Sequence, residues 1–180
     1  MKALVLLSGG LDSAVVLAKM LERGRCESVG FDYGQPHRIE LAYAERLAGH
    51  YGVPFRIVGL PNLPRTDDVV FAGRNLLLAA HGIAIAASEG FDAIALGCNF
   101  SDWDRFPDCR PAFWKGVNAA SAAYGVHVQM PLLQMSKAQV VAEAEELGVP
   151  IGSTWSCYQP RGGDPCGECL ACRTRAEAGA

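Results

Sequence analysis

ALVLLSGGLDS, residues 3–13, joins a continuous apolar run to a glycine-rich loop and the start of a helix. The apolar run Ala3–Leu7 is typical of a strand that is buried on both faces, as in a parallel sheet. Gly9 and Gly10 allow the backbone to approach an anion closely, and a helix start offers free N–H groups and a positive dipole end. We therefore expect a strand–loop–helix unit that binds phosphate groups.

The polar residues of this loop refine the expectation. Ser8 and Ser13 add hydroxyl donors, whereas Asp12 would repel a phosphate unless a cation lay between them, which makes Asp12 a candidate Mg²⁺ contact. The loop matches neither G-x-x-x-x-G-K-[ST] nor G-x-G-x-x-G, so it is neither a P-loop nor a dinucleotide fingerprint. The alternative is a purely structural Gly-Gly turn that binds no ligand, in which Asp12 or Ser13 only caps the helix.

The rest of the chain alternates short apolar runs with longer segments of helical period. Further strands are predicted at residues 28–31, 55–60, 92–98 and 127–133, and helices at 12–23, 38–51, 75–88, 111–124 and 137–147. This alternation predicts an α/β fold with a doubly wound, five-stranded parallel sheet. In such sheets ligands bind beyond the carboxyl ends of the strands. The helix at 75–88 is apolar nearly all round, which predicts a central buried helix.

Composition narrows the class of protein. The chain has 180 residues, of which 50% are hydrophobic and 19% charged, and its net charge is −3. These values indicate one globular domain with its own core, and the acidic balance argues against a broad nucleic-acid surface. MKALVLL is too short for the apolar part of a secretory signal, and no apolar stretch is long enough to span a bilayer. We expect a cytoplasmic protein with no membrane partner.

The C-terminal stretch CYQPRGGDPCGECLAC contains four cysteines, Cys157, Cys166, Cys169 and Cys172. In a reducing compartment such a cluster favours a metal over disulfides. Four thiolates complete a tetrahedral Zn²⁺ without an open position, so the site is predicted to be structural. An iron–sulfur cluster is the alternative, and it would colour the protein. Changing Cys169 to Ser is therefore predicted to cause loss of folding rather than selective loss of chemistry.

The loop sequence Ser-Gly-Gly-x-Asp-Ser resembles the pyrophosphate loop of the N-type ATP pyrophosphatases, which cleave ATP between the α and β phosphates and adenylate their substrates. Further motifs extend the resemblance to the 7-cyano-7-deazaguanine synthase (QueC) family over almost the whole chain. They are FDYGQPH (31–37), GRN (73–75), GCNFSD (97–102), FPDCRP (106–111), SK (136–137) and TWSC (154–157). The resemblance implies an adenine nucleotide alpha hydrolase-like, Rossmann-like domain in residues 1–153 and a small zinc-binding segment in residues 154–180.

The resemblance also implies a reaction and a set of site residues. The family converts 7-carboxy-7-deazaguanine and ammonia to 7-cyano-7-deazaguanine (preQ0) with ATP, through adenylated and amide intermediates, and forms homodimers. ATP, Mg²⁺ and a structural Zn²⁺ are the implied cofactors. Catalytic roles are assigned to Asp12, Ser13, Arg110 and Lys137. ATP binding is assigned to Leu7, Ser8, Gly9, Gly10, Leu11, Asp12, Ser13, Ala14, Val15, Val16 and Leu17.

The guanine-like edge of the substrate presents N–H donors, which a carboxylate would accept, and its ring faces would stack on aromatic side chains. The candidate substrate-binding residues are Phe31, Tyr33, Gln35, Arg74, Asn75, Asn99, Asp102, Asp108 and Trp155. The competing interpretation is that loop aspartates cap turns, that tryptophan belongs to the core, and that Arg74 pairs with a structural carboxylate.

One departure from the family keeps alternatives open. Only Pro61–Ala72 separates the strand at 55–60 from Gly73, where members of the family carry a much longer segment. That segment lies near the expected mouth of the active site, so the acceptor is in doubt. The enzyme could stop at the amide or join the deazaguanine to another amine.

Two alternatives change the class of function. A tRNA-thiolating ATP pyrophosphatase would use Cys98 or Cys109, although free cysteine is commonly a small buried residue and Cys98 is expected to be one. A zinc-dependent nucleic-acid-binding module is supported only by Arg161, Arg173 and Arg175 near the cysteines. The acidic net charge makes nucleic acid an unexpected partner in both cases.

Overall fold

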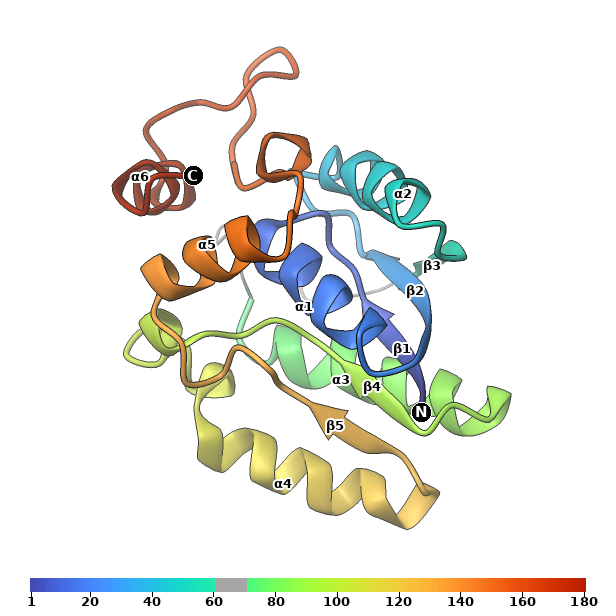
Figure 1. Cartoon of the computed structure of the whole chain (residues 1–180). Helices are drawn as coiled ribbons and strands as arrows, with labels where there is room; N and C mark the ends of the chain where they lie inside the picture. The colour runs from blue at the N-terminus through green and yellow to red at the C-terminus, as the bar shows by residue number, and fades with distance from the viewer. Residues whose placement is uncertain (61–70) are drawn as a thin grey trace.

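The computed structural model describes residues 1–60 and 71–180 (Figure 1). Within these residues the sheet consists of β1 (Lys2–Leu6), β2 (Arg25–Asp32), β3 (Phe55–Gly59), β4 (Ala93–Ala95) and β5 (His127–Gln129). The strands lie in the order β3-β2-β1-β4-β5, and every neighbouring pair is parallel. The predicted doubly wound, five-stranded parallel sheet is confirmed.

Two strands are shorter than the apolar runs that predicted them. β4 ends at Ala95 because Gly97 lies against the first helix, where an added Cβ would be 3.0 Å from the Asp12 backbone carbon. β5 ends at Gln129, and Pro131 follows two residues later without an N–H to donate. Both strands therefore stop where their chains turn away to form the loops beyond the sheet.

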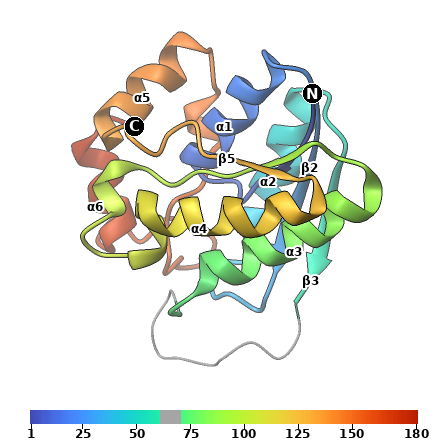
Figure 2. The same ribbon diagram turned by 90° about the horizontal axis from the view of Figure 1, so that it is seen from below.

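Five of the described α-helices lie on the two faces of the sheet, and the C-terminal one lies apart from it (Figures 1 and 2). The described α-helices are α1 (Leu11–Leu21), α2 (Glu40–His50), α3 (Arg74–Glu89), α4 (Pro111–Ser121), α5 (Lys137–Glu146) and α6 (Leu170–Glu177). One core cluster joins the sheet to α1, α2 and α5, and the other joins it to α3 and α4. These are the two layers that a doubly wound sheet requires to bury both of its faces.

The helix at 75–88 is present as α3, but the prediction that it is buried all round is wrong. Only Ala79, Gly82 and Ala86 of α3 are buried, and Leu76 is 51% exposed. A Cβ at Gly82 would lie 3.0 Å from Leu6 Cδ1, so the helix approaches β1 closely along this stripe. The small residues therefore permit close helix–sheet packing on one side, and they do not indicate burial on every side.

The C-terminal segment contains an element that the hydrophobic period does not predict. α6 follows Cys169 directly, and none of its residues is buried. Its apolar face is weak because the cysteines and arginines of this segment interrupt the helical pattern. No helix within residues 1–60 and 71–180 has the length and apolar character needed to cross a bilayer.

Candidate active site

A cavity of about 270 Å³ lies at the carboxyl ends of β1, β2 and β4. Its walls come from the loop after β1, the segments after β2 and β4, the start of α3, Lys137 of α5, residues 155–158 and α6. The strand order reverses at β1, between β2 and β4, and ligands of such sheets bind at this crevice. The cavity therefore lies where the sequence predicts the site.

The loop Ser8–Gly10 is held in shape by the two predicted serines. Ser8 N donates to Ser13 Oγ (3.2 Å), Gly10 N donates to Ser8 Oγ (3.3 Å), and Ser13 Oγ donates to Gly10 O (2.9 Å). Gly9 adopts a φ of +89°, and an added Cβ would lie only 2.1 Å from Glu40 O. Only glycine fits at position 9, where the loop contacts α2. The loop conformation is therefore fixed by the hydrogen bonds of Ser8 and Ser13 and by the contact with α2.

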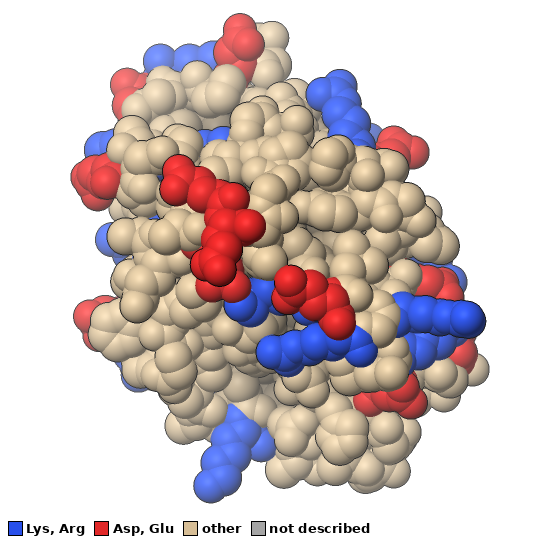
Figure 3. Space-filling model, viewed as in Figure 1, with Lys and Arg blue, Asp and Glu red and all other residues tan. Residues whose placement is uncertain are grey.

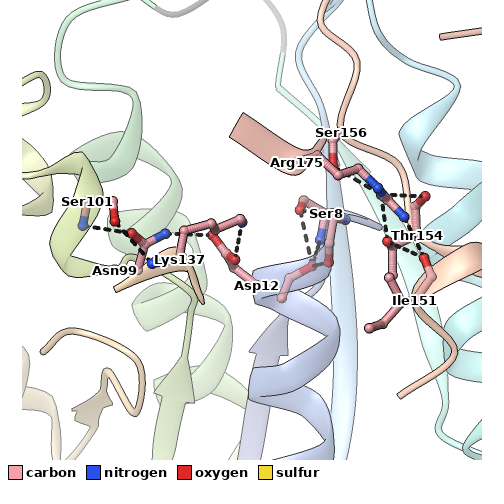
Figure 4. Close-up of polar contacts among 11 residues, drawn as sticks. Ser8, Asp12, Asn99, Ser101, Lys137, Ile151, Thr154, Ser156 and Arg175 are labelled. Carbon is pink, nitrogen blue, oxygen red and sulfur yellow. Dashed lines mark hydrogen bonds and ion pairs between the residues drawn. The ribbon is translucent and has the colours of Figure 1, made fainter. Parts of the chain in front are cut away.

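Asp12 joins the loop to α5. Its Oδ1 accepts a hydrogen bond from Lys137 Nζ (2.5 Å), and its Oδ2 accepts one from Asn99 Nδ2 (3.0 Å), as Figure 4 shows. Ser136 and Gln139 form a capping box that fixes the start of α5, where Lys137 is the first residue. A positive charge and an oriented carboxylate thus lie together beside the loop, an arrangement suited to a phosphate and its metal ion.

Asp102 is a second carboxylate near this pair. Burial raises its pKa, the negative charge of Asp12 raises it further, and Lys137 opposes both effects. Its position on the cavity wall agrees with the prediction that it lies at the site. A carboxyl group whose pKa is raised in this way is available as a hydrogen-bond donor or as an acceptor, depending on its neighbours.

A buried polar cluster lines the opposite part of the cavity. Arg74 Nη1 donates to Tyr33 Oη (3.5 Å), and Arg74 Nε is buried without a hydrogen-bond partner among the described residues. Glu40 Oε1 accepts from Gln35 Nε2 (3.1 Å) and lies 3.6 Å from His37 Nε2. A buried guanidinium with an unused donor is a built position for an anionic or carbonyl group of a ligand.

Glu40 and His37 have strongly shifted pKa values. Burial raises the pKa of Glu40 to about 7, although the Gln35 hydrogen bond and the charge of Arg74 oppose the shift. Burial, with a further contribution from the charge of Arg74, lowers the pKa of His37 to about 4. Both shifts favour the neutral side chain, as expected where charge is taken out of water.

The Glu40→Gln variant is expected to change how stability depends on pH. Between about pH 4.5 and 7 the folded chain retains a proton on Glu40 that the unfolded chain has lost, so Glu40 lowers stability as pH rises. The free energy of unfolding of the variant, relative to the native chain, should therefore rise by about 3 kcal/mol across this window. Urea unfolding at a series of pH values measures the difference.

The prediction concerns the difference in unfolding free energy between the variant and the native chain, because His37 changes stability with pH in the opposite direction. Its lowered pKa contributes stability that is lost as pH falls through about 4. Glu45→Gln, an exposed substitution on the same helix, is the control and should show no such trend. A difference for Glu40→Gln that stays flat from pH 4.5 to 7 would show that Glu40 ionises normally.

Two thiols meet at the floor of the cavity. Asn75 Nδ2 lies 3.5 Å from Cys109 Sγ and 3.7 Å from Cys98 Sγ, and both cysteines are buried as expected of Cys98. A hydrogen bond to Cys109 and burial raise the pKa of Cys98 well above its usual value. A protonated thiol is a poor nucleophile, and Cys98 therefore does not favour a thiolation enzyme. Asp108 Oδ2 accepts from Asn75 N (3.1 Å), so this carboxylate caps α3.

Several residues assigned from the resemblance do not reach the cavity. Arg110, assigned a catalytic role, donates from Nε to Trp103 O (2.8 Å) and lies outside the cavity wall. Gln35 is buried and donates to Phe31 O (3.1 Å), so its amide braces the segment after β2. Ala14–Leu17 are buried within α1 and fill the core. In this structure these side chains do not line the cavity, whereas Leu7, Ser8 and Gly10–Ser13 of the predicted ATP-binding residues do.

Trp155 contributes through its backbone more than through its ring. Its N–H donates to Gly9 O (2.8 Å), which ties the C-terminal segment to the loop. Its indole Nε1 donates to Cys157 O (2.7 Å), and its ring centroid lies 5.1 Å from that of Tyr43. The side chain, only 4% exposed, is thus held as part of the fold although it borders the cavity.

The four C-terminal cysteines meet as their spacing predicts. The Sγ atoms of Cys157, Cys166, Cys169 and Cys172 all lie within 4.8 Å of one another, and the four thiols are not paired as disulfides. Cys166 N and Cys169 N donate to the Sγ atoms of Cys157 (3.2 Å) and Cys166 (3.3 Å). Four sulfur donors with supporting N–H groups fit a closed metal site.

The arginines near this cluster have partners within the chain. Arg161 pairs with Glu168, Arg173 Nη1 donates to Glu168 O (2.8 Å), and Arg175 contacts residues 151–156. Figure 3 shows acidic and basic side chains mixed on one face, without a broad basic patch there. The only sequence feature that supported a nucleic-acid-binding module is therefore accounted for by internal contacts.

Sequence reasoning missed two contributors to the cavity. Glu40 follows His37 by three residues, a spacing that places both on one side of a helix turn and could have indicated the pair. The sequence shows Arg175 only as a positive charge near the cysteines. Nothing in its local sequence indicates that it reaches the segment around Trp155.

Comparison with protein families gives a match over nearly the whole chain. The family described as "Queuosine biosynthesis protein QueC" matches in two pieces, residues 2–70 and 62–180. The pieces overlap within the short Pro61–Ala72 connection, most of which lies outside the described residues. The shortening noted in the sequence therefore coincides with the break between the two matched pieces.

Curated relatives named 7-cyano-7-deazaguanine synthase match this chain over most of their own length. The relative from Leptospira interrogans is 34% identical, over 97% of this chain and 84% of its own length. The relative from Parasynechococcus marenigrum is 38% identical, over 96% and 90%. The relative from Thermoplasma acidophilum is 35% identical, over 97% and 85%.

Two solved structures share the fold at low sequence identity. The NMN synthetase from Francisella tularensis has a TM-score of 0.57 and 14% identity, over 92% of this chain and 70% of its own. The glutamine-dependent NAD⁺ synthetase from Acinetobacter baumannii has a TM-score of 0.59 and 19% identity, over 81% and 28%. At these identities the similarity concerns the architecture alone.

Proposed function

Because the chain belongs to the QueC family, we propose that it makes 7-cyano-7-deazaguanine from 7-carboxy-7-deazaguanine, ammonia and ATP. The observation that carries this conclusion is the match to named synthases over nearly the full length of both chains. The cavity supports it, because the loop, Lys137 and the buried guanidinium of Arg74 face one space. The enzyme is thus an ATP-dependent ligase that forms C–N bonds.

The chemistry requires two activations of one carbon. A carboxylate oxygen attacks the α-phosphorus of ATP and pyrophosphate leaves, which turns that oxygen into part of a leaving group. Ammonia then attacks the carbonyl carbon, and AMP and a proton leave to give the amide. A second ATP adenylates the amide oxygen, and loss of AMP and a proton forms the nitrile. The residues mainly position the reactants and stabilise charge.

The loop and α5 provide the phosphate side of this site. The N–H groups at the start of α1 face the position of the phosphates, and Lys137 neutralises charge that develops on the α-phosphate. Asp12 is the residue placed to hold Mg²⁺, which supplies further neutralisation of the phosphates when bound. Asn99 keeps the Asp12 carboxylate oriented through its 3.0 Å hydrogen bond.

The buried cluster provides the deazaguanine side. Arg74 is placed to donate to the oxygen atoms on one edge of the substrate, where the carbonyl and the 7-carboxyl group lie together. Phe31 and Tyr33 border the same part of the cavity and can contact the ring faces. Glu40, in the same cluster, and Asp102, beside Asp12, are carboxyl groups of the cavity wall that can accept from the N–H donors of the substrate.

Four further features belong to the same proposal. We take the metal of the cysteine cluster to be Zn²⁺, the nitrogen source to be free ammonia, and the compartment to be the cytoplasm. We also propose a homodimer, which exposed apolar residues Ile57 (47%) and Leu76 (51%) support. Metal analysis, ammonium dependence, fractionation and light scattering test these features separately.

The function is tested by the products of the purified protein with MgATP, the deazaguanine acid and ¹⁵N-ammonium. We expect AMP, pyrophosphate and a nitrile whose mass shows one ¹⁵N atom. Glutamine in place of ammonium tests the nitrogen source. Formation of neither AMP nor any ¹⁵N product would refute the proposal.

The same assay separates the alternative product. The family match divides at the short Pro61–Ala72 connection, and this departure supports the alternative that the enzyme stops at the amide. That enzyme would accumulate ¹⁵N-amide with one AMP per product and would not proceed to the nitrile with added ATP.

A further inference from the structure

Arg175 of α6 makes the densest set of side-chain hydrogen bonds at the edge of the cavity. Its Nη1 donates to Thr154 Oγ1 (2.9 Å), Thr154 O (3.1 Å) and Ser156 Oγ (3.1 Å). Its Nη2 donates to Ile151 O (2.7 Å). Figure 4 shows the guanidinium among these acceptors, beside the loop residue Ser8. A planar guanidinium is suited to holding several acceptors in one arrangement.

The segment that Arg175 holds is joined by a hydrogen bond to the loop Ser8–Gly10. Thr154 and Ser156 flank Trp155, whose N–H donates to Gly9 O (2.8 Å). A Cβ added to Gly10 would meet Trp155 O at 3.4 Å, so the segment also lies in van der Waals contact with the loop. On the other side the loop abuts Glu40 O of α2. The loop is therefore held between α2 and the segment that Arg175 grips.

α6 is not held in place by a hydrophobic face. None of its residues is buried, and a helix of eight residues is marginal without tertiary support. Cys169 precedes α6 and Cys172 lies in its first turn, so the metal cluster holds its start, whereas Arg175 holds its last turn. The placement of α6 and the placement of the loop are thus joined through one side chain.

We propose that Arg175 is a positioning residue for ATP, which holds residues 154–156 against the loop so that the loop N–H groups face the phosphates. The inference rests on the proposed function only in that the loop binds ATP. Arg175 acts through Trp155 and Gly9 and does not contact the reacting atoms. Its loss leaves four backbone or hydroxyl acceptors without their charged donor, and the loop is then free to shift.

The test compares Arg175→Met and Arg175→Lys with the matched variant Arg173→Met. Arg173 is on the same helix but donates to Glu168 O, away from the loop. Affinity for a non-hydrolysable ATP analogue is measured by calorimetry without the acceptor, together with the KM for ATP and for ammonium. We expect Arg175→Met to weaken analogue binding and to raise the KM for ATP by about tenfold to a hundredfold. Arg175→Lys should recover part of the loss, and the KM for ammonium should stay within twofold.

Metal content and the acceptor side separate positioning from loss of fold. The metal-to-protein ratio should equal that of the native chain in all three variants. If Arg175→Met loses metal, Thr154→Val and Ser156→Ala remove acceptors without touching α6 and should each weaken ATP binding several-fold. Analogue affinity unchanged within twofold in the metal-loaded Arg175 variants, or in both acceptor variants, overturns the inference. Failure of the native chain to bind the analogue would instead refute the proposed function.

Discussion

The Lys137→Met variant is expected to form product with a kcat about 10²- to 10³-fold below that of the native chain. Lys137 is the cation that the fold places at the phosphate loop, 2.5 Å from Asp12 Oδ1. Methionine keeps the length of the side chain and removes the charge that neutralises the α-phosphate in both activations. Quenched-flow measurement of AMP and nitrile at saturating substrates gives the kcat.

The loss should lie in turnover and not in folding. The Lys137 and Asp12 side chains are 20% and 21% exposed, so an unpaired Asp12 remains in contact with water and the free energy of unfolding changes by about 1 kcal/mol. Lys115→Met, an exposed substitution on α4, is the control for loss of a lysine. A kcat within threefold of the native value would mean that another group neutralises the α-phosphate.

Cys169→Ser is expected to abolish metal binding and to release the C-terminal segment while the sheet stays folded. The sequence alone predicts general loss of folding, but the two core clusters lie around the sheet and include no residue of α6 itself. Removing one of four thiolates takes away the support at the start of α6, and a helix of eight residues is marginal when only the hydrogen bonds of Arg175 remain. Limited proteolysis should cut residues 158–180, and the circular dichroism of the sheet and its helices should remain.

The same variant should lose nearly all ATP-dependent turnover. Release of α6 removes Arg175, and with it the clamp on the segment that carries Trp155. Cys26→Ala is the control, because Cys26 lies at the start of β2, at the end of the strand opposite to the cavity. A Cys169→Ser protein that keeps one metal per chain and an uncut C-terminal segment would show that the metal has a different set of ligands. Visible colour of the native protein would indicate iron–sulfur in place of zinc.

Much of the candidate site follows from short stretches of sequence. The apolar run with Ser-Gly-Gly-Leu-Asp-Ser predicts the strand, the loop and the anion site, because a buried parallel strand and a glycine turn depend on adjacent residues. The cysteine spacing predicts the thiolate cluster for the same reason. The rule that ligands bind beyond the carboxyl ends of parallel strands predicts Asp12 at the site, whereas Asn99, Asp102 and Lys137 are assigned to it by the resemblance to the family.

Other assignments fail where orientation matters. Arg110 follows a predicted loop, yet its guanidinium turns to Trp103 O, and Ala14–Leu17 face the core. α3 has a sequence that is apolar all round, but it packs through one stripe of small residues. A one-dimensional pattern states which residues are apolar or charged, and it does not state how many sides of a helix have a neighbour.

Sequence was therefore sufficient for the parallel α/β architecture, the phosphate loop and the thiolate cluster, since each depends on residue types at short, regular separations. The assembled chain alone reveals the pairing of Lys137 with Asp12, the raised pKa of Glu40 and the hydrogen bonds of Arg175 to residues 151–156. Those features join segments that are far apart in the chain, and burial and hydrogen-bond geometry arise only when the segments meet. The loop that opens the sequence is thus recognisable by itself, but its shape is maintained by α2 on one side and by the C-terminal segment on the other.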